Sequence, residues 1–330
     1  MKSASGYPTI HIWTSVSAIC VAAGLALWPS IYPEAGAVFG IAAFFMTMKE
    51  VSAYTSPYQF VMAYLAALVS GLACDSITFP VVTLALLFCT TGVIGRMLFF
   101  RYVGYTQHTW LEPLFLVLAV GVWIGGNLAF PHGWMAWAVP VPFFVFQGIM
   151  AMGILKDKMQ LLSFTKGGYR IAIGAEAPDF TLPDQEGAMT ELSSFRNERH
   201  LLLVFVRGDW CPGCHMMLRT YQKEAARFRT KNIFAMAIGP DPVGVNREMV
   251  EKLGLDFKVL SDERQKTAMV YGVQLNKYDN DFAEKYEEGI PLPASFLIDK
   301  KGIVRYVSRP DKVGEFLDPR TIFPIIDGLS

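Results

Sequence analysis

The charged residues of this chain are divided so unevenly that its two halves must fold by different rules. Residues 1–155 hold only four of the 29 lysines and arginines and four of the 29 aspartates and glutamates. Residues 156–330 carry the rest, at the density usual for a soluble domain. So long a stretch with so few charges has too little polar surface to enclose a core in water. We therefore predict an all-α membrane domain over residues 1–155, a linker over 156–172 and an α/β domain over 173–330.

The apolar half contains six windows of about 18–20 residues, which is the length that a helix needs to cross a bilayer. They cover approximately residues 10–28, 31–48, 57–74, 77–95, 112–130 and 134–155. The first window is followed by no small-residue cleavage site, so it reads as a span and not as a signal peptide. The second is interrupted at its start by Pro33, Glu34 and Gly36. Together the windows predict a polytopic bundle of about six transmembrane helices.

Loop charges predict the side of the membrane on which the C-terminal domain lies. An even number of spans leaves both chain ends on one side, and the basic residues flanking the spans all lie there: Lys2, Lys49, Arg96, Arg101, Lys156, Lys158, Lys166 and Arg170. The opposite loops, around residues 29–33, 74–76 and 131–133, have no lysine or arginine. The positive-inside rule then predicts a multi-pass protein of the bacterial inner membrane with its C-terminal domain in the cytoplasm. One span more or fewer would place that domain outside.

One short motif carries the chemistry of the soluble half. Trp210-Cys211-Pro212-Gly213-Cys214 follows the apolar run 201–206, so it falls between a strand and a helix. The positive end of the helix dipole stabilises a thiolate at a helix N-terminus. A second cysteine one turn further on can close a disulfide with the first. The motif therefore predicts a redox-active dithiol.

The elements around the motif form a pattern of alternating strands and helices. The sequence predicts strands at 200–206, 233–238, 294–298 and 303–307, and helices at about 211–229, 246–253 and 262–271. An extended segment at 177–182 precedes a turn at 184–187, and a hairpin turn lies at 299–302. This β-α-β-α-β-β order is that of a thioredoxin-like α/β sandwich.

Residues 173–326 resemble the peroxiredoxin-like branch of the thioredoxin superfamily, known as AhpC/TSA or redoxin. Four stretches carry the resemblance: Gly174–Phe180, Phe205–Cys214, Pro291–Asp299 and Gly302–Tyr306. The resemblance covers slightly under half of the chain. It does not extend to the membrane half, which we assign to no family.

The peroxiredoxin alignment places Cys214 at the peroxidatic position. Peroxiredoxins resemble one another in a Pro-x3-Thr-x2-Cys motif and a distant arginine, which together bind and polarise the peroxide. In this chain the proline position is Arg207 and the threonine position is Cys211, and the arginine falls at about Pro293. The donors that would stabilise a departing hydroxide are missing, and such donors are usually the largest catalytic contribution.

The thioredoxin alignment instead makes Cys211 the exposed nucleophile and Cys214 the shielded resolving thiol. Trp210 and Pro212 then stand beside the pair as supporting residues, and Pro293 resembles the cis-proline that faces the dithiol. Arg207 would favour the thiolate electrostatically. The buried carboxylate of thioredoxins is replaced by Phe205, which leaves proton handling to water or to Asp209.

The sequence thus predicts a membrane-anchored thiol–disulfide oxidoreductase that needs no cofactor besides its dithiol and no metal. The resemblance implies protein or small-molecule disulfides or peroxides as substrates, and a thioredoxin- or glutathione-type reductant as electron donor. The lipid bilayer is a predicted partner, whereas the zero net charge and the lack of a basic run argue against nucleic acid.

Several other interpretations of the cysteines stay open. The domain could be a thiol peroxidase that reduces hydroperoxides, or a redox sensor that controls the membrane half. Cys211-x-x-Cys214-His215 also matches a c-type haem attachment motif, and the pair could be a zinc half-site or a structural disulfide. Cys20, Cys74 and Cys89 are predicted as packing residues, with an electron relay through Cys20 and Cys89 as the alternative.

Overall fold

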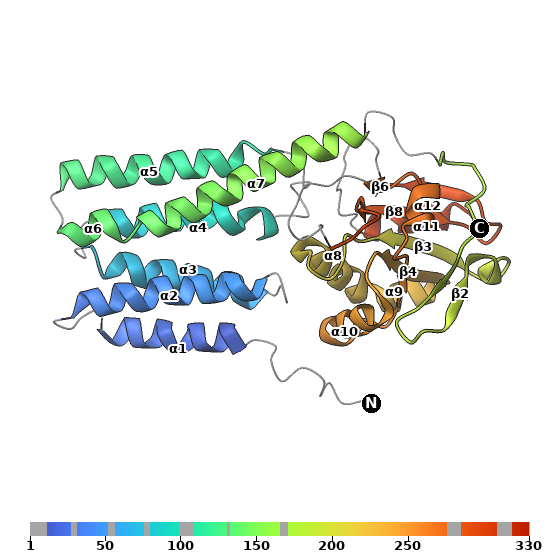
Figure 1. Cartoon of the computed structure of the whole chain (residues 1–330), viewed down its shortest axis with the longest axis horizontal. Coiled ribbons are helices and arrows are strands. Elements are labelled where there is room, and N and C mark those ends of the chain that lie inside the picture. The colour runs from blue at the N-terminus through green and yellow to red at the C-terminus, as the bar shows by residue number, and fades with distance from the viewer. Residues whose placement is uncertain are drawn as a thin grey trace. The chain divides into compact units, whose positions relative to one another are not determined.

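The computed structural model describes most of the chain and divides it into two compact units (Figure 1). The described residues are 12–27, 32–51, 57–75, 80–98, 108–130, 133–165, 171–275, 285–308 and 319–329. Apart from short terminal and loop segments, one unit ends at Lys158 and the other begins at Met159. This division falls inside a helix that continues to Thr165, so the first part of the predicted linker is helical. The basic residues Lys2, Arg101, Lys166 and Arg170 lie outside the described residues.

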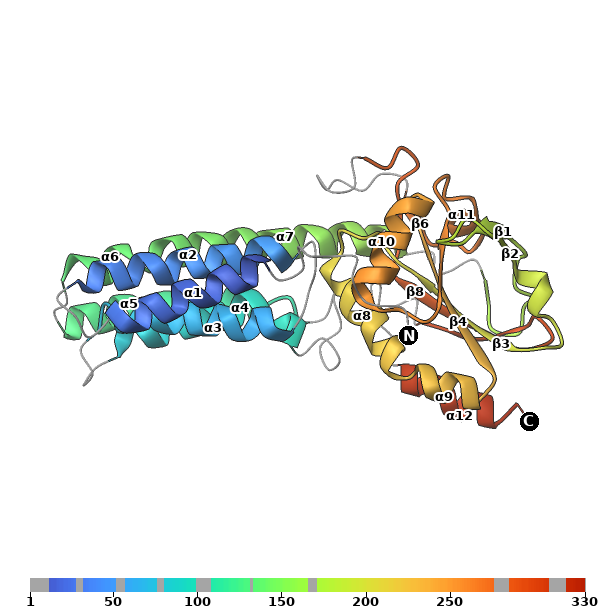
Figure 2. The ribbon, with the colours of Figure 1, turned by 90° about the horizontal axis from the view of Figure 1, so that it is seen from below.

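Every secondary-structure element described in the N-terminal unit is a helix. Its helices are α1 (Ile12–Leu27), α2 (Pro33–Val51), α3 (Pro57–Leu72), α4 (Val81–Leu98), α5 (Leu111–Ala129), α6 (Trp134–Ala138) and α7 (Val141–Thr165). They run side by side as a bundle (Figures 1 and 2). Each predicted window contains a helix, and the last window is divided between α6 and α7. The prediction of an all-α N-terminal half is confirmed at this level.

Fewer of the described helices have the length and composition of a membrane span than the sequence predicts. Among the described residues, only Leu111–Ala129 and Trp134–Gln160 are both long and apolar enough to cross a membrane. The apolar segments Ile12–Leu27, Pro57–Leu72 and Val81–Arg96 are shorter. Helix α2 has 19 residues but carries Glu34, Lys49 and Glu50. Three of the predicted windows therefore contain an apolar segment that is too short to span, and the window at α2 contains a helix with three charges.

Buried polar contacts join the helices of this unit. Arg96 of α4 and Glu112 of α5 form a two-pronged ion pair, with Nε–Oε1 at 2.5 Å and Nη2–Oε2 at 3.0 Å. Both side chains are almost completely buried. The Gln147 amide of α7 donates to the main-chain carbonyl of Glu112 at 3.1 Å. Three helices therefore meet at one polar contact, which fixes how they pack.

The C-terminal unit is built on a five-stranded sheet with the order β5-β4-β3-β8-β9. Strands β3 (His200–Phe205), β4 (Ile233–Gly239) and β5 (Lys258–Ser261) are parallel. Strands β8 (Ala294–Ile298) and β9 (Val304–Val307) continue the sheet in antiparallel pairs. The central strand β3 is buried after its first residue, as expected of a continuous apolar run in the middle of a sheet.

The helices and shorter elements complete this unit. Helices α8 (Pro212–Lys223), α9 (Ala225–Thr230), α10 (Val243–Leu253), α11 (Lys266–Val270) and α12 (Phe323–Asp327) connect or follow the strands. Helix α10 packs beside α8 (Figure 2). The shorter elements are β1 (Thr181–Pro183), β2 (Met189–Glu191), η1 (Leu192–Phe195), β6 (Gln274–Leu275), β7 (Ile290–Pro291) and η2 (Pro319–Ile322).

The prediction of a thioredoxin-like α/β domain is confirmed, with differences in detail. The strands predicted at 200–206, 233–238, 294–298 and 303–307 are β3, β4, β8 and β9. The helix predicted over 211–229 is broken at Glu224 into α8 and α9. The helix predicted from residue 262 begins only at Lys266, and strand β5 was not predicted.

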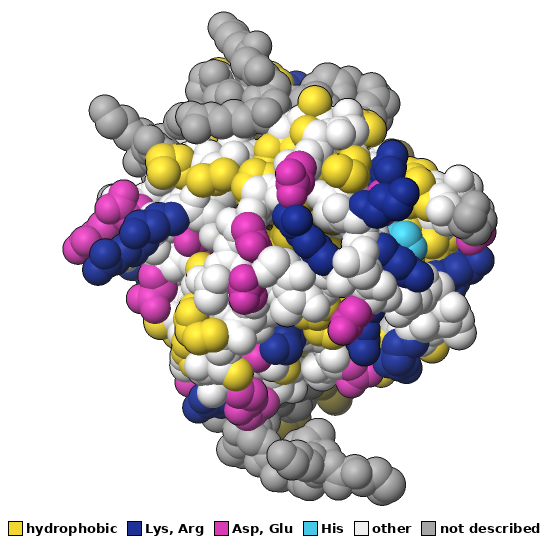
Figure 3. Space-filling view, turned by 90° about the vertical axis from the view of Figure 1, so that its right-hand side faces the viewer, with side chains coloured by type: hydrophobic (Ala, Val, Ile, Leu, Met, Phe, Trp, Pro, Cys, Tyr) yellow, Lys and Arg dark blue, Asp and Glu magenta, His cyan; other side chains and the backbone are white. Residues whose placement is uncertain are grey.

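The core of the unit is strongly aromatic beside the central strand. Phe205, Tyr271 and Phe296 contact one another, with ring centroids 5.1–5.8 Å apart, and all three are fully buried. Charged side chains of both signs are interspersed over the face of this unit seen in Figure 3. An apolar interior under a mixed charged surface is the pattern of a domain that folds in water.

Candidate functional site

The Trp210–Cys214 motif lies where β3 ends and α8 begins. Cys211 is the N-cap residue of α8 and has extended backbone angles, while Pro212 occupies the first turn. Proline is favoured there because its missing N–H would have no helical partner. The carboxyl ends of the parallel strands β4 and β5 lie at the same sheet edge. A short loop after Phe205 therefore leads from the end of β3 to the first cysteine, at a helix N-terminus.

The two cysteines are free thiols in contact with each other. The main-chain N–H of Cys214 donates to Sγ of Cys211 at 3.3 Å, so Cys211 caps the helix with its sulfur. An N-terminal N–H group that points at a sulfur favours the thiolate form of that sulfur. The local geometry is suited to a reactive Cys211.

The exposure predicted for Cys211 is wrong. Its exposed fraction is 6%, and Cys214 is fully buried. The loop folds back on itself, since the Cys211 N–H donates to the Gly208 carbonyl at 3.2 Å. Trp210 packs partly into the core beside it. Cys211 is still the more accessible of the two thiols.

The surroundings of Cys214 keep it protonated. Burial raises the pKa of the Cys214 thiol well above its ordinary value, and the hydrogen bond and charge of Cys211 raise it further. The main-chain N–H and the buried guanidinium of Arg207 act in the opposite direction without overcoming this. The predicted effect of Arg207 is therefore present, but it is exerted on Cys214. A buried thiol of raised pKa is a poor first nucleophile.

A glycine and an aspartate hold the loop that precedes the motif. Gly208 has φ +127°, a conformation that other residues rarely adopt. A Cβ at this position would lie 2.6 Å from Oη of Tyr286 and 2.9 Å from Oδ2 of Asp241. The buried Asp241 accepts hydrogen bonds from the Asp209 N–H at 2.6 Å and from the Tyr286 hydroxyl at 2.5 Å. Burial and the charge of Asp241 raise the pKa of Tyr286, which keeps this hydroxyl a donor.

A second set of charges surrounds Asp209, two residues before Cys211. Its Oδ1 lies 3.1 Å from Nε2 of the fully buried His215, and both of its oxygens pair with the ammonium of Lys252 from α10. Burial opposes ionisation of Asp209, but the hydrogen bond of His215 and the charge of Lys252 keep its pKa below the usual value. Asp209 is therefore an ionised, fully engaged carboxylate.

Pro293 is buried next to the site, but not in the predicted form. The described residues contain no cis peptide bond, so the cis conformation predicted for Pro293 is wrong. Leu292 donates to the Val273 carbonyl at 2.6 Å, and Ala294 pairs with Phe205. These two contacts hold the chain extended across Pro293, one step along the sheet from Val206.

The sequence missed three residues of the site: Asp241, Lys252 and Tyr286. Asp241 lies just beyond β4, at the carboxyl edge of a parallel strand, which is a signal that the sequence offered. Lys252 and Tyr286 had no comparable signal, because one lies on a surface helix and the other follows a segment without a clear pattern. Folding alone brings them to the motif.

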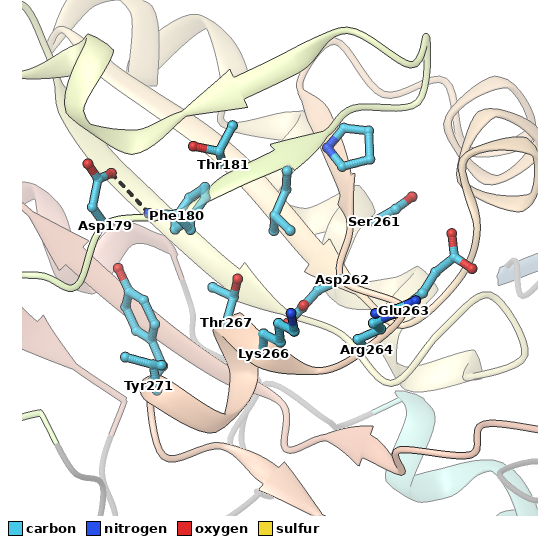
Figure 4. A pocket seen from close by; sticks show the side chains of 13 residues that line it. Asp179, Phe180, Thr181, Ser261, Asp262, Glu263, Arg264, Lys266, Thr267 and Tyr271 are labelled. Atoms are coloured by element: carbon cyan, nitrogen blue, oxygen red, sulfur yellow. Dashed lines mark hydrogen bonds between the residues drawn. The ribbon is translucent and has the colours of Figure 1, made fainter.

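A pocket of about 460 Å³ lies at the end of β5 and does not include either cysteine (Figure 4). It is lined by residues of the β1 region, such as Asp179 and Thr181, and by Asp262 and Tyr271. Asp262 accepts the Ala268 N–H at 2.9 Å, and the Tyr271 hydroxyl donates to the Pro178 carbonyl. These polar groups are engaged in holding the chain. Among the described residues, no group of three or more His, Cys, Asp or Glu side chains is placed to hold a metal.

The other three cysteines belong to the helical unit. Cys20 of α1 and Cys89 of α4 are buried, and Sγ of Cys74, just after α3, donates to the Ser70 carbonyl at 3.3 Å. All three are free thiols. Helix α1 packs mainly on α2 and α3, whereas α4 packs mainly on α3 and α5. The structure therefore separates the helices of Cys20 and Cys89.

Comparisons with known proteins place the C-terminal unit in a family. Residues 173–307 match the AhpC/TSA family. The Coxiella burnetii protein that carries the name peroxiredoxin bcp is 31% identical over 137 residues, which are 42% of this chain and 87% of that protein. Thiol-disulfide oxidoreductase ResA of Bacillus anthracis is 30% identical over 165 residues, which are 50% of this chain and 76% of that protein.

Two further proteins are similar to this chain. Chloroplastic peroxiredoxin Q of Oryza sativa subsp. japonica is 28% identical over 153 residues, and this chain spans only 66% of its length. The crystal structure of peroxidoxin BcpB from Mycobacterium tuberculosis matches with a TM-score of 0.43 at 22% identity, covering 49% of this chain and 99% of that one.

The sheet order, the dithiol at the strand–helix junction and these relatives define a redoxin domain of the thioredoxin superfamily. The chain belongs to the AhpC/TSA family through residues 173–307. The prediction of an oxidoreductase is confirmed at this level.

Proposed function

We propose that the chain is a membrane-anchored thiol–disulfide oxidoreductase in which Cys211 attacks and Cys214 resolves. The observation that carries the proposal is the asymmetry of the two thiols. Sγ of Cys211 accepts a helix N-terminal N–H and retains some exposure, whereas Cys214 is fully buried with a raised pKa. Two-step exchange requires a thiolate that attacks the substrate first and a shielded thiol that reacts second.

The reaction proceeds by two sulfur exchanges. The Cys211 thiolate attacks one sulfur of a substrate disulfide, a mixed disulfide forms, and the other substrate sulfur leaves as a thiolate. Cys214 then loses its proton and attacks Sγ of Cys211, which releases the second substrate thiolate. The substrate gains two electrons, and the protein is left with a Cys211–Cys214 disulfide. A thioredoxin- or glutathione-type reductant supplies two electrons to restore the dithiol.

The different surroundings of the two thiols favour disulfide exchange over peroxide reduction. Peroxide reduction would need Cys214, at the peroxidatic position, to act as the attacking thiolate. Burial and the neighbouring Cys211 oppose ionisation of Cys214. The positions that would polarise a peroxide hold Cys211 and Pro293, neither of which is a strong hydrogen-bond donor. Reduction of hydroperoxides is the second candidate, and the relatives named as peroxiredoxins favour it.

One coupled assay separates the two candidates. The full-length protein would be assayed for NADPH consumption with thioredoxin and thioredoxin reductase, using a protein disulfide and then a hydroperoxide as substrate. We expect the higher kcat/KM with the disulfide. A higher kcat/KM with the hydroperoxide would reverse the assignment and make Cys214 the first nucleophile.

The helical unit is proposed to anchor the redoxin domain in the bacterial inner membrane as a multi-pass bundle, with that domain in the cytoplasm. Two described helices long enough to span support membrane association. The orientation rests on the loop charges. In a cytoplasmic position the dithiol would be kept mostly reduced, so the domain would act as a reductant. Protease added to intact spheroplasts should leave the C-terminal domain intact, and its digestion would contradict the orientation.

A further inference from the structure

The residue after the second cysteine, His215, is placed in an unusual way for a side chain at the start of an amphipathic helix. Its side chain is fully buried, and its main-chain N–H donates to the carbonyl of Cys211 at 3.2 Å. Its imidazole therefore lies in the first turn of the helix that Cys211 caps. His215 is four positions after Cys211, so their backbones are about one helical turn apart along the axis.

The contacts of His215 define which ring nitrogen carries the proton. Asp209 is ionised and can only accept, so Nε2 of the neutral ring is the donor across the 3.1 Å contact. Nδ1 is then a bare acceptor. It is buried and has no hydrogen-bond partner among the described residues. A buried nitrogen lone pair without a donor is a site where a proton can be taken up.

We propose that Asp209, His215 and Lys252 are positioning residues that couple the reactivity of the Cys211 thiol to a proton held on His215. The proposal rests on Cys211 being the attacking thiol. Asp209 holds the ring through its side chain and the loop before Cys211 through its main chain, by way of Asp241. Lys252 from the neighbouring helix α10 neutralises the carboxylate. When Nδ1 takes up a proton, the set changes from neutral to positive at the end of the helix that Cys211 caps.

The charges that act on His215 come from the loop before α8, from α8 itself and from α10. Burial lowers the pKa of His215; the hydrogen bond and charge of Asp209 raise it, while the charges of Lys252 and of Arg219 on α8 lower it further. The ring is therefore neutral at neutral pH and becomes charged only at a pH below its ordinary pKa. An imidazolium near Cys211 favours the thiolate, so the thiol loses its reactivity on acidification less steeply than an isolated thiol would.

The test measures the rate at which iodoacetamide alkylates Cys211 in the reduced full-length protein, resolved from Cys214 by peptide mass spectrometry, between about pH 5 and pH 9. His215→Gln keeps a side chain that can donate to Asp209 but cannot become charged. We expect alkylation of this variant to be about three- to tenfold slower than that of the wild type at the acid end of this range, where the ring is charged, and equal to it near pH 9. His200→Gln, at the other end of β3, is the matched control and should follow the wild-type curve at every pH.

Two further variants guard against a merely structural effect. Asp209→Asn removes the charge that raises the pKa of His215. The part of the rate–pH curve that depends on His215 should therefore move to lower pH. Lys252→Gln removes a charge that lowers this pKa, so the same part should move to higher pH. Equal slowing of His215→Gln at all pH values, or displacement of both other variants in one direction, would overturn the proposal. Failure of the proposed function is distinguishable from these outcomes, because it would appear as disulfide reductase activity retained by Cys211→Ser.

Discussion

The five cysteines of this chain occupy two contrasting settings, one in each unit. In the helical unit, Cys20 and Cys89 lie inside helices, where the main-chain N–H groups are already engaged. In the redoxin unit, Cys211 caps a helix and receives an N–H at its sulfur. Cys211 and Cys89 are both buried, so burial does not distinguish them. The position of a thiol on its helix and the charges around it therefore decide whether it can react.

The largest expected effect is on the thiol that caps α8. Cys211→Ser should lower the rate of insulin disulfide reduction by on the order of 10³-fold, because a serine hydroxyl cannot form the mixed disulfide. The rate is followed by the turbidity of the precipitating insulin chain. A circular dichroism spectrum like that of the wild type would show that the variant is folded. Retention of the wild-type rate would remove Cys211 from the mechanism and with it the contrast between the two settings.

A second prediction concerns the buried ion pair of the helical unit. Glu112→Gln removes the carboxylate charge that pairs with the buried Arg96 guanidinium, which should lower the free energy of unfolding by about 3–5 kcal/mol. Glu176→Gln breaks the largely exposed pair with Arg196 and should cost less than about 1 kcal/mol. Denaturant unfolding of both variants measures the difference. The Cys211 alkylation rate should be unchanged in Glu112→Gln, and a changed rate would mean that the two units are coupled.

The loop before the dithiol provides a third prediction. Gly208→Ala places a Cβ against Tyr286 and Asp241 at a positive φ, so it should lower the free energy of unfolding by about 1–3 kcal/mol and slow disulfide reduction. Gly244→Ala in α10 meets open space at an ordinary φ and should leave stability unchanged or slightly raised. Thermal unfolding and the insulin assay check both variants. Equal stability of the two would show that the Gly208 loop is not held as described.

The pH dependence of stability gives a fourth, smaller effect. Burial alone would raise the pKa of Asp184, but hydrogen bonds from Lys258 and from the N–H groups of Ala188 and Glu186 hold it below the usual value. Its folded pKa is below its unfolded pKa, so its contribution is complete above the unfolded value and is lost as pH falls through the folded one. Asp184→Asn should therefore cost about 1–2 kcal/mol at neutral pH. The exposed Asp256→Asn should cost nothing measurable, and a difference for Asp184→Asn that persisted at pH 2 would contradict this account.

The smallest effect is expected in the helical unit. Alanine at Cys20, Cys74 and Cys89 together should leave the rate of disulfide reduction within about twofold of the wild type, because none of these thiols has the setting of Cys211. The insulin assay on the full-length triple variant measures this. Cys211→Ser in the same assay provides the lower limit of activity. A large loss in the triple variant would restore the electron relay through the helices.

The fold of the redoxin unit was predictable from local patterns where those patterns were strong. The apolar run of β3, the Pro212 N-terminus of α8 and the Gly254 end of α10 are all signals that short segments carry. Strand β5 has only four residues, Lys258–Ser261, and its sequence has no alternation that would reveal it. It forms because β4 offers an unpaired edge, which is a tertiary effect.

The candidate site was predictable only in part, for the same reason. Both cysteines, Trp210 and Arg207 belong to one segment, and that segment carries its own chemistry. Lys252 reaches Asp209 from another helix, and Tyr286 reaches Asp241 from a distant segment. No spacing in the sequence encodes these contacts. Pro293 directly precedes Ala294, which pairs with Phe205 at the end of β3, but the cis peptide conformation predicted for it is wrong.

The most direct test of the central claim asks which sulfur first binds the substrate. Cys214→Ser and Cys211→Ser would each be mixed in the reduced state with a peptide disulfide, quenched with acid, and examined by peptide mass spectrometry. We predict a stable mixed disulfide on Cys211 in Cys214→Ser and almost none on Cys214 in Cys211→Ser. A mixed disulfide that forms faster on Cys214 would contradict the order of attack proposed here.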